Sequence, residues 1–141
     1  PKMSVIVQKM IDAKKSGVVF TVNPVTKNNN EMVIEAVFGL GESLVSGIVT
    51  PDNFTIDKNN RKIINENINE KNTAMIRQNG KNKKIKLNNK KANEKTLNEK
   101  ELNKIIKESL KVENHYKKPM DIEWAIDDKL YILQARPITT L

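Results

Sequence analysis

The chain has 141 residues, a formal net charge of +8, one histidine and no cysteine. This length is typical of one domain, and the lack of cysteine excludes a disulfide framework, a thiolate metal site and a cysteine nucleophile. No apolar run approaches the roughly 20 residues of a membrane-spanning helix, and residues 1–4 lack the pattern of a secretory signal. We therefore expect a cytoplasmic protein without a membrane partner. Because the chain begins with Pro1 and not with methionine, we also expect a piece of a longer protein.

The positive charge is concentrated in one stretch. Residues 81–95 contain seven lysines and one acid, Glu94. Basic stretches can bind nucleic acid through phosphate contacts. This one has no aromatic side chain for base stacking and no arginine for reading bases. We therefore do not expect nucleic acid as a partner.

Apolar and β-branched stretches in the first half predict strands. We expect strands at residues 4–10, 17–22 and 32–38, a tight turn at 39–42, a short helical turn at 43–47, and a small hairpin formed by 53–57 and 62–64. Residues 65–95 have few large apolar side chains and many lysines and asparagines. They are predicted to form a variable, weakly structured surface excursion that can contain one or two exposed strands.

A helix is predicted from residue 98 to about residue 116. Asn98 is a suitable N-cap, and Glu101 is placed to complete a capping box. Apolar residues then recur about every 3.6 positions, which predicts one buried stripe made of Leu102, Ile105, Ile106, Leu110 and Tyr116. Pro119 disfavours helical geometry in the residue before it. Together the elements predict an α+β fold with a mixed or antiparallel sheet and packed helices.

The C-terminal residues 119–137 are predicted to form a β-hairpin. With Asp127 and Asp128 as a two-residue loop, opposed positions sum to 255, so that Glu123 would face Ile132. Strand side chains alternate between faces. One face then collects Asp121, Glu123, Ile132, Gln134 and Arg136. The other is apolar and contains Ile122, Trp124, Tyr131, Leu133 and Ala135.

Two interpretations fit the polar face of this hairpin. Carboxylate and carbonyl oxygens are the ligands that Mg²⁺ prefers, with substrate phosphates completing its shell, and Arg136 could bind a phosphate through paired hydrogen bonds. Such a set suits phosphoryl transfer. The alternative is an ordinary cross-strand salt bridge between Arg136 and a carboxylate on an exposed sheet. The residue pattern alone leaves both open.

Several segments resemble the nucleotide-binding domain of the phosphoenolpyruvate synthase and pyruvate phosphate dikinase family. They occur in the family's order and are residues 16–26, 35–42, 45–47, 50–52, 115–116, 119–125 and 131–137. The resemblance implies an ATP-grasp fold, of which residues 1–141 would be the second half. In such a fold ATP lies between two subdomains. Residues 65–95 match poorly.

The resemblance also implies roles for individual residues. Gln8 would line the ATP site, and Glu42 would support it. Asp121, Glu123 and Gln134 would contact ATP and Mg²⁺, and Arg136 would bind the phosphates directly. Arg136, Glu123 and Gln134 are thus the implied catalytic residues. The implied reaction moves the β-phosphate of ATP to a histidine in another domain and then to pyruvate, giving phosphoenolpyruvate, AMP and phosphate.

Departures from the family pattern limit what this chain is expected to do. The family usually has glycine where Lys27 or Asn28 stands, and at Lys117. The preceding ATP-grasp subdomain, the phosphohistidine domain and the pyruvate-binding domain are not in the chain, so we expect it to be inactive alone. Rifampicin phosphotransferases share the same ATP-binding domain and phosphorylate an antibiotic instead. That acceptor, and a non-catalytic orphan fragment, remain open alternatives.

Overall fold

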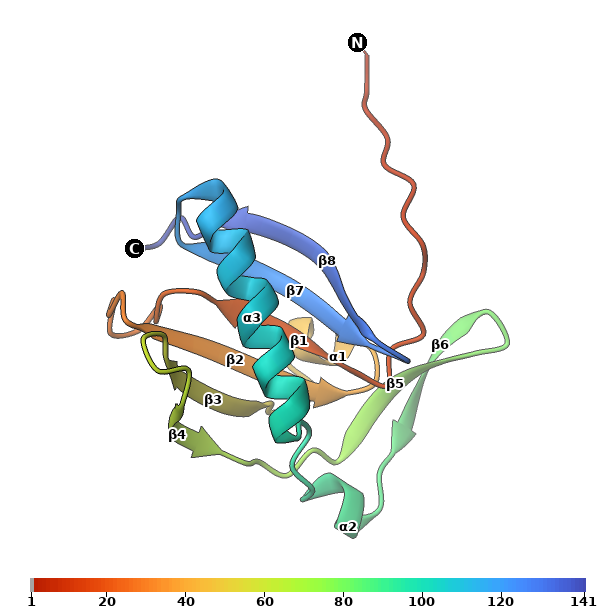
Figure 1. Ribbon diagram of the computed structural model, residues 1–141. Coiled ribbons are helices and arrows are strands. Elements are labelled where there is room, and N and C mark those ends of the chain that lie inside the picture. Colours follow the sequence, from red (N-terminus) through yellow and green to blue (C-terminus); the bar gives the residue numbers. More distant parts are fainter. Residues whose placement is uncertain (1) are drawn as a thin grey trace.

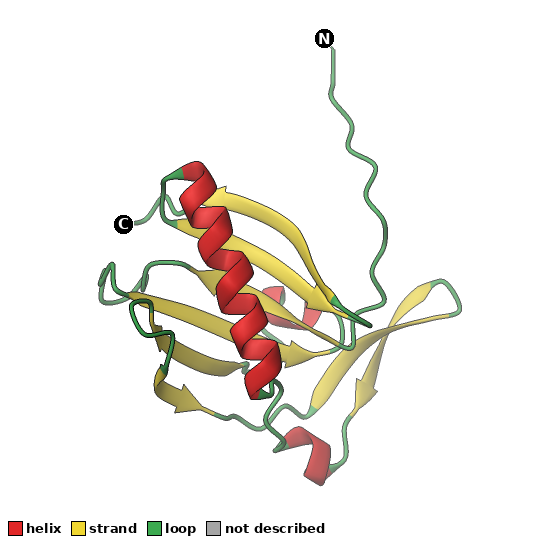
Figure 2. Ribbon diagram, in the orientation of Figure 1, coloured by secondary structure: helices red, strands yellow, loops and turns green. Residues whose placement is uncertain are grey.

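The computed structural model describes residues 2–141 as a six-stranded antiparallel sheet with one long helix across a face (Figures 1 and 2). The strand order is β4-β3-β2-β1-β7-β8. These strands are β1 (Lys15–Phe20), β2 (Glu31–Phe38), β3 (Asp52–Asp57), β4 (Ile63–Asn67), β7 (Met120–Ile126) and β8 (Leu130–Pro137). A separate hairpin is formed by β5 (Thr73–Gln78) and β6 (Lys81–Lys86). The helices are α1 (Glu42–Val45), α2 (Asn89–Ala92) and α3 (Glu99–Tyr116). The predicted α+β class with an antiparallel sheet is confirmed.

The hydrophobic core lies between α3 and the sheet. Leu102, Ile105 and Ile106 of α3 are buried against the strands, as the helical period predicted. Leu110 packs against this core but is only partly buried. Tyr116 was predicted to belong to the stripe and is instead 52% exposed. The buried stripe therefore ends before the last turn of the helix.

Local sequence signals at both ends of α3 have the expected structures. Asn98 and Glu101 form the predicted capping box, in which each side chain accepts a hydrogen bond from the backbone of the other residue. At the opposite end, Lys117 is the C-cap and has a left-handed backbone with φ of 55°. Glycine is the residue that adopts this conformation most easily. The glycine that the resemblance implies at this position would therefore relieve backbone strain.

The predicted strand at residues 4–10 is wrong. Residues 2–10 run as an extended segment without secondary structure (Figure 2). Val5, Ile6 and Val7 are 78%, 88% and 95% exposed. A strand requires a neighbour that pairs with its backbone, and no other segment of residues 2–141 does so. The β-branched composition thus predicts extended backbone correctly. It does not show whether another strand is present to pair with that backbone.

Residues 65–95 are more ordered than the sequence suggested, because a buried network anchors them. The Lys71 side chain is fully buried and donates to the Asp52 carboxylate at 2.7 Å. The other carboxylate oxygen of Asp52 accepts from the backbone and hydroxyl of Thr96, each at 2.9 Å. Asp52 thus connects both ends of the segment that contains β5, β6 and α2 to the start of β3 in the main sheet.

In the part of the chain that the structure describes, none of the helices has both the length and the apolar character that crossing a membrane requires.

Candidate functional site

A row of polar side chains crosses the sheet on the face opposite α3. Ile122 and Trp124 belong to the core beneath α3, so Glu123 between them points to the other face. Strand pairing extends the row in both directions, because residues opposite one another share a face. In order from β8 to β4 the row is Gln134, Glu123, Glu35, Asn53 and Asn67, with the apolar Val18 of β1 between the two glutamates.

The predicted register of the C-terminal hairpin is wrong, although its polar face is right. Glu123 lies opposite Gln134, not Ile132, and Asp121 lies opposite Arg136. A β-bulge at this point shifts the pairing, so that Ile132 is opposite Trp124. A bulge places one extra residue on one strand and re-aims the side chains around it. The four polar residues therefore stay together, while Ile132 moves to the apolar face.

Asp121 and Arg136 form the cross-strand ion pair that the sequence had left open. The Arg136 Nε–H donates to the Asp121 carboxylate at 3.2 Å. The Arg136 side chain is 68% exposed, whereas that of Asp121 is 16% exposed. The carboxylate thus fixes one edge of the guanidinium group, and the remaining N–H groups face outward. This leaves Glu123 and Gln134 as the pair whose side chains bond to no other group of residues 2–141.

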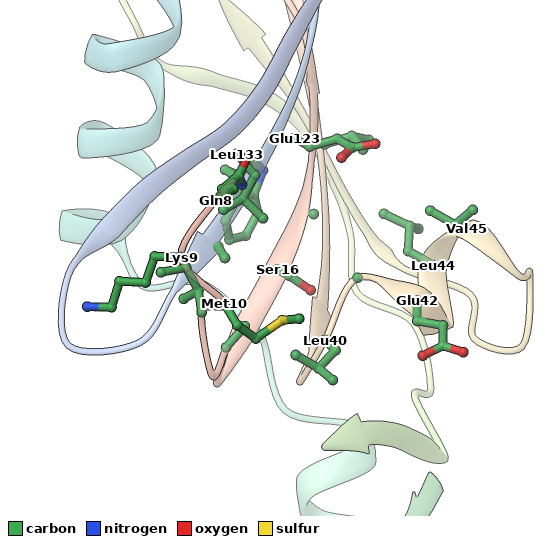
Figure 3. A pocket seen from close by; sticks show the side chains of 17 residues that line it. Gln8, Lys9, Met10, Ser16, Leu40, Glu42, Leu44, Val45, Glu123 and Leu133 are labelled. Carbon is green, nitrogen blue, oxygen red and sulfur yellow. The ribbon is translucent and has the colours of Figure 1, made fainter. Parts of the chain in front are cut away.

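A mostly apolar cavity of about 280 Å³ opens beside Glu123 (Figure 3). In the view of Figure 3, Gln8, Met10 and Leu133 lie on one side of it and Leu44 and Val45 on the other. The full lining is Gln8, Lys9, Met10, Ile11, Ala13, Ser16, Gly17, Val18, Leu40, Gly41, Glu42, Leu44, Val45, Glu123, Trp124, Ala125 and Leu133. Small-molecule sites are usually concave and apolar with a few polar groups, and this cavity has that character.

The structure brings together only some of the predicted site residues at this cavity. Gln8, Glu42 and Glu123 line it. Gln134 lies directly across from Glu123 but is outside the lining, as are Asp121 and Arg136. Leu133 lines the cavity although the sequence assigned it to the apolar core face. The bulge explains this difference, and no local sequence signal marks a bulge at Leu133.

Glu35 is a polar member of the row that the sequence analysis did not single out as a site residue. It lies two strands from Glu123, with Val18 of β1 between them, which corresponds to roughly 10 Å. Burial raises the pKa of the Glu35 carboxyl above its ordinary value of 4.5. A carboxylate within the apolar stretch Met32–Phe38 is the sequence signal that could have identified it.

The side-chain oxygen atoms on this face could bind a metal ion only together with oxygen atoms of a ligand. Among residues 2–141, no three Asp, Glu, His or Cys side chains gather closely enough for a protein-only metal site. Glu123 and Gln134 still offer two hard oxygen donors whose Cβ atoms should be about 5 Å apart. Mg²⁺ is often held by one or two protein oxygens while substrate phosphates supply the rest. The residues therefore fit an ion that arrives with a phosphate-bearing ligand.

An apolar cavity bordered by carboxylate and amide groups, with a guanidinium group farther along the same hairpin, is consistent with a domain that binds a nucleotide. The chain belongs to the family described as the AMP/ATP-binding domain of pyruvate phosphate dikinase, which matches residues 1–141.

Curated relatives agree with this family. The chain is 48% identical over 140 residues to a probable phosphoenolpyruvate synthase of Archaeoglobus fulgidus, covering 99% of the chain and 18% of the relative. It is 43% identical to a probable phosphoenolpyruvate synthase of Methanocaldococcus jannaschii, covering 99% of the chain and 12% of the relative. It is also 43% identical to the phosphoenolpyruvate synthase of Pyrococcus furiosus, covering 99% of the chain and 18% of the relative. The chain thus belongs to a family of enzymes and spans less than a fifth of the length of these relatives.

Proposed function

We propose that this chain is the ATP-binding segment of a phosphoenolpyruvate synthase-like dikinase, and forms the second half of an ATP-grasp domain. One observation carries the proposal: the apolar cavity and the polar row meet at Glu123. The cavity has the size and character to take the flat base of a nucleotide. The adjoining row offers Glu123 and Gln134 as oxygen donors for a Mg²⁺ ion that arrives with the phosphates, and Arg136 lies beside this pair on β8. ATP needs both environments side by side.

Glu123, Gln134 and Arg136 are the residues that we assign to the phosphates. Glu123 and Gln134 would hold Mg²⁺ together with phosphate oxygens, and the bound ion would supply neutralisation of phosphate charge. Arg136 would donate its free N–H groups to the phosphates, since only its Nε–H is engaged by Asp121. Asp121 then orients Arg136, which is a narrower role than the direct metal contact suggested by the resemblance.

A second part of the protein would close the site from the side of the exposed N-terminal segment. Val5–Val7 are exposed on both sides of the extended backbone. A continuous apolar run of this kind suits a strand that is buried on both faces of a sheet. The neighbouring residues Gln8–Met10 already line the cavity. We therefore infer that residues 5–7 form a strand in a sheet of the preceding ATP-grasp subdomain.

The whole reaction that we propose consumes ATP, pyruvate and one water molecule, and releases phosphoenolpyruvate, AMP and phosphate. The β-phosphate passes through a histidine of a separate domain, and water accounts for the release of the γ-phosphate. Phosphoryl transfer depends mainly on positioning and charge neutralisation. The residues of this chain supply those two effects, and the acceptor and the histidine lie elsewhere.

The test uses the full-length protein that carries this chain and ATP labelled in its β-phosphate. We expect AMP formation, transfer of the label to a histidine, and then transfer to added pyruvate. Label on a protein histidine that moves to rifampicin but not to pyruvate would replace the acceptor and keep the ATP site. No binding of ATP would refute the proposal.

A further inference from the structure

The lysine-rich hairpin β5–β6 supports one wall of the cavity without lining it. The turn before α1 contributes Leu40 and Gly41 to the lining, and α1 itself begins with Glu42, which also lines the cavity. The backbone N–H of Leu40 donates to the Met75 carbonyl of β5 at 2.7 Å. Gly39 has φ of 78°, and a Cβ atom at this position would collide with the same carbonyl. β5 therefore lies so close to the turn that only glycine fits between them.

A second attachment joins the other strand of the hairpin to Glu42. The Asn82 side-chain amide of β6 donates to the Glu42 carboxylate at 2.8 Å. The Asn82 carbonyl oxygen accepts from Arg77 at 3.3 Å, and these two residues are directly paired across β5 and β6. Arg77 thus orients the amide so that its N–H group points to Glu42. The result is a continuous contact from the hairpin to a carboxylate of the cavity wall.

The base of the hairpin is fixed by the core. Lys71 stands just before β5 and is held by Asp52 in the buried network at the start of β3. Salt bridges on a surface contribute little, but removing one partner of a buried pair is strongly destabilising. The hairpin is therefore anchored at its base by Lys71 and attached to the cavity wall by Met75 and Asn82.

We propose that Asn82 is a positioning residue for the nucleotide pocket, acting through Glu42. This inference rests on the proposed function. Glu42 is a negative charge on the wall of a cavity assigned to the base of a nucleotide, and an unrestrained carboxylate there would repel the phosphates of the same ligand. Asn82 holds the carboxylate toward the hairpin, and Arg77 behind it supplies a compensating positive charge. The hairpin thus sets both the shape of the wall and the direction of its charge.

The experiment measures binding of a non-hydrolysable ATP analogue by calorimetry in the full-length protein that carries this chain. Asn82→Asp keeps the shape but removes the donor and adds a like charge beside Glu42. We expect binding to weaken roughly three- to tenfold, as for the loss of one hydrogen bond with added repulsion. Asn82→Gln keeps the amide and should recover most of the affinity. Asn103→Ala on the exposed face of α3 is the matched control and should bind like the parent.

Four outcomes test this inference and separate it from the proposed function. In a Glu42→Gln background the effect of Asn82→Asp should largely disappear, because Asn82 acts through that carboxylate. If the parent protein binds the analogue and Asn82→Asp binds it equally well, the positioning role is wrong. It is also wrong if Asn82→Asp and Asn82→Gln lose affinity and thermal stability together, since Asn82 would then only hold the hairpin in place. A parent protein that fails to bind the analogue refutes the proposed function itself.

Discussion

Glu123 and Gln134 lie directly opposite each other on β7 and β8, at the point where the polar row meets the cavity. Neither is the partner of an ion pair, whereas the next pair along the same strands, Asp121 and Arg136, is joined by one. The two adjacent pairs therefore differ in what they can offer a ligand. The first offers oxygen donors, and the second offers an oriented guanidinium group.

Substitutions at Glu123 and Arg136 should affect catalysis much more than folding. Glu123→Gln keeps the shape but removes the charge, and Arg136→Lys keeps the charge but loses the planar fork. Each should lower phosphoryl transfer by roughly 10²-fold or more, the scale seen when one preorganised electrostatic group is removed. The measurement is single-turnover formation of AMP and phosphohistidine in the full-length protein. Lys83→Ala on the exposed hairpin is the control, and near-parental rates for Glu123→Gln would identify the row as ordinary surface.

The 141-residue chain by itself should form no measurable AMP from ATP. Gln8–Met10, which line the cavity, belong to an extended segment that pairs with no strand, and the proposal places the rest of the ATP site and the histidine in other domains. When only one half of the site neutralises the charge of the ATP phosphates, most of the activation barrier to phosphoryl transfer remains. AMP release can be followed by chromatography over several hours. A rate close to that of the full-length protein would contradict the proposed division of the site.

Glu35→Gln should stabilise the fold at neutral pH. Burial raises the pKa of Glu35 above 4.5, so the folded state binds its proton more readily than the unfolded state. Stability is therefore lost as the pH rises through the folded-state pKa, and the loss is absent below about pH 4.5. The glutamine variant should unfold at higher urea than the parent at pH 7, and this difference should shrink toward pH 4. The exposed Glu70→Gln is the control, and an advantage that grows on acidification would contradict the assignment.

The loss of stability caused by shortening a side chain of α3 should increase with the burial of that side chain. Ile105 has no exposed surface, and Ile105→Ala should cost about 2–5 kcal/mol of unfolding free energy. Leu110 is only partly buried, so Leu110→Ala should cost clearly less, about 1–2 kcal/mol. Urea unfolding followed by circular dichroism gives both values. Equal losses at the two positions would mean that Leu110 is packed more tightly than its exposure indicates.

Glycine at two left-handed positions should stabilise the chain. Lys27 and Lys117 have φ of 62° and 55°, where a side chain with a Cβ atom is strained. Lys117→Gly should gain about 1 kcal/mol, and Lys27→Gly should gain a similar amount. Lys118→Gly provides the contrast, because glycine there only adds freedom to the unfolded chain. A loss of stability in Lys117→Gly would show that the C-cap needs the lysine side chain.

Features that depend on nearby residues were predictable from the sequence. The capping box of α3 and the stripe Leu102–Ile106 depend on contacts three or four residues apart. The polar face of the last hairpin was also predictable, because strand alternation survives a change of register by two positions. The register itself was not, since it depends on a three-residue connection and a bulge that the Asp127–Asp128 pair does not signal.

Contacts between segments that are distant in the chain could not be predicted from the sequence. Asn82 and Glu42 are 40 residues apart, and their hydrogen bond depends on how β5 packs against the turn at Gly39. Lys71 was counted among the residues of a surface excursion, yet it is fully buried because Asp52 compensates its charge. Composition described residues 65–95 as polar and basic but could not show which of these side chains point inward.

Trp124 gives the chain a built-in optical probe. It is the only tryptophan, it has no exposed surface, and its indole N–H has no hydrogen-bond partner. Its ring packs where a side chain on Gly17 would stand, and both residues border the cavity. An indole in such a dry, unbonded environment emits fluorescence at short wavelength. A ligand that enters the cavity, or a denaturant that opens the sheet, will therefore change the emission of this single ring, and no label needs to be introduced.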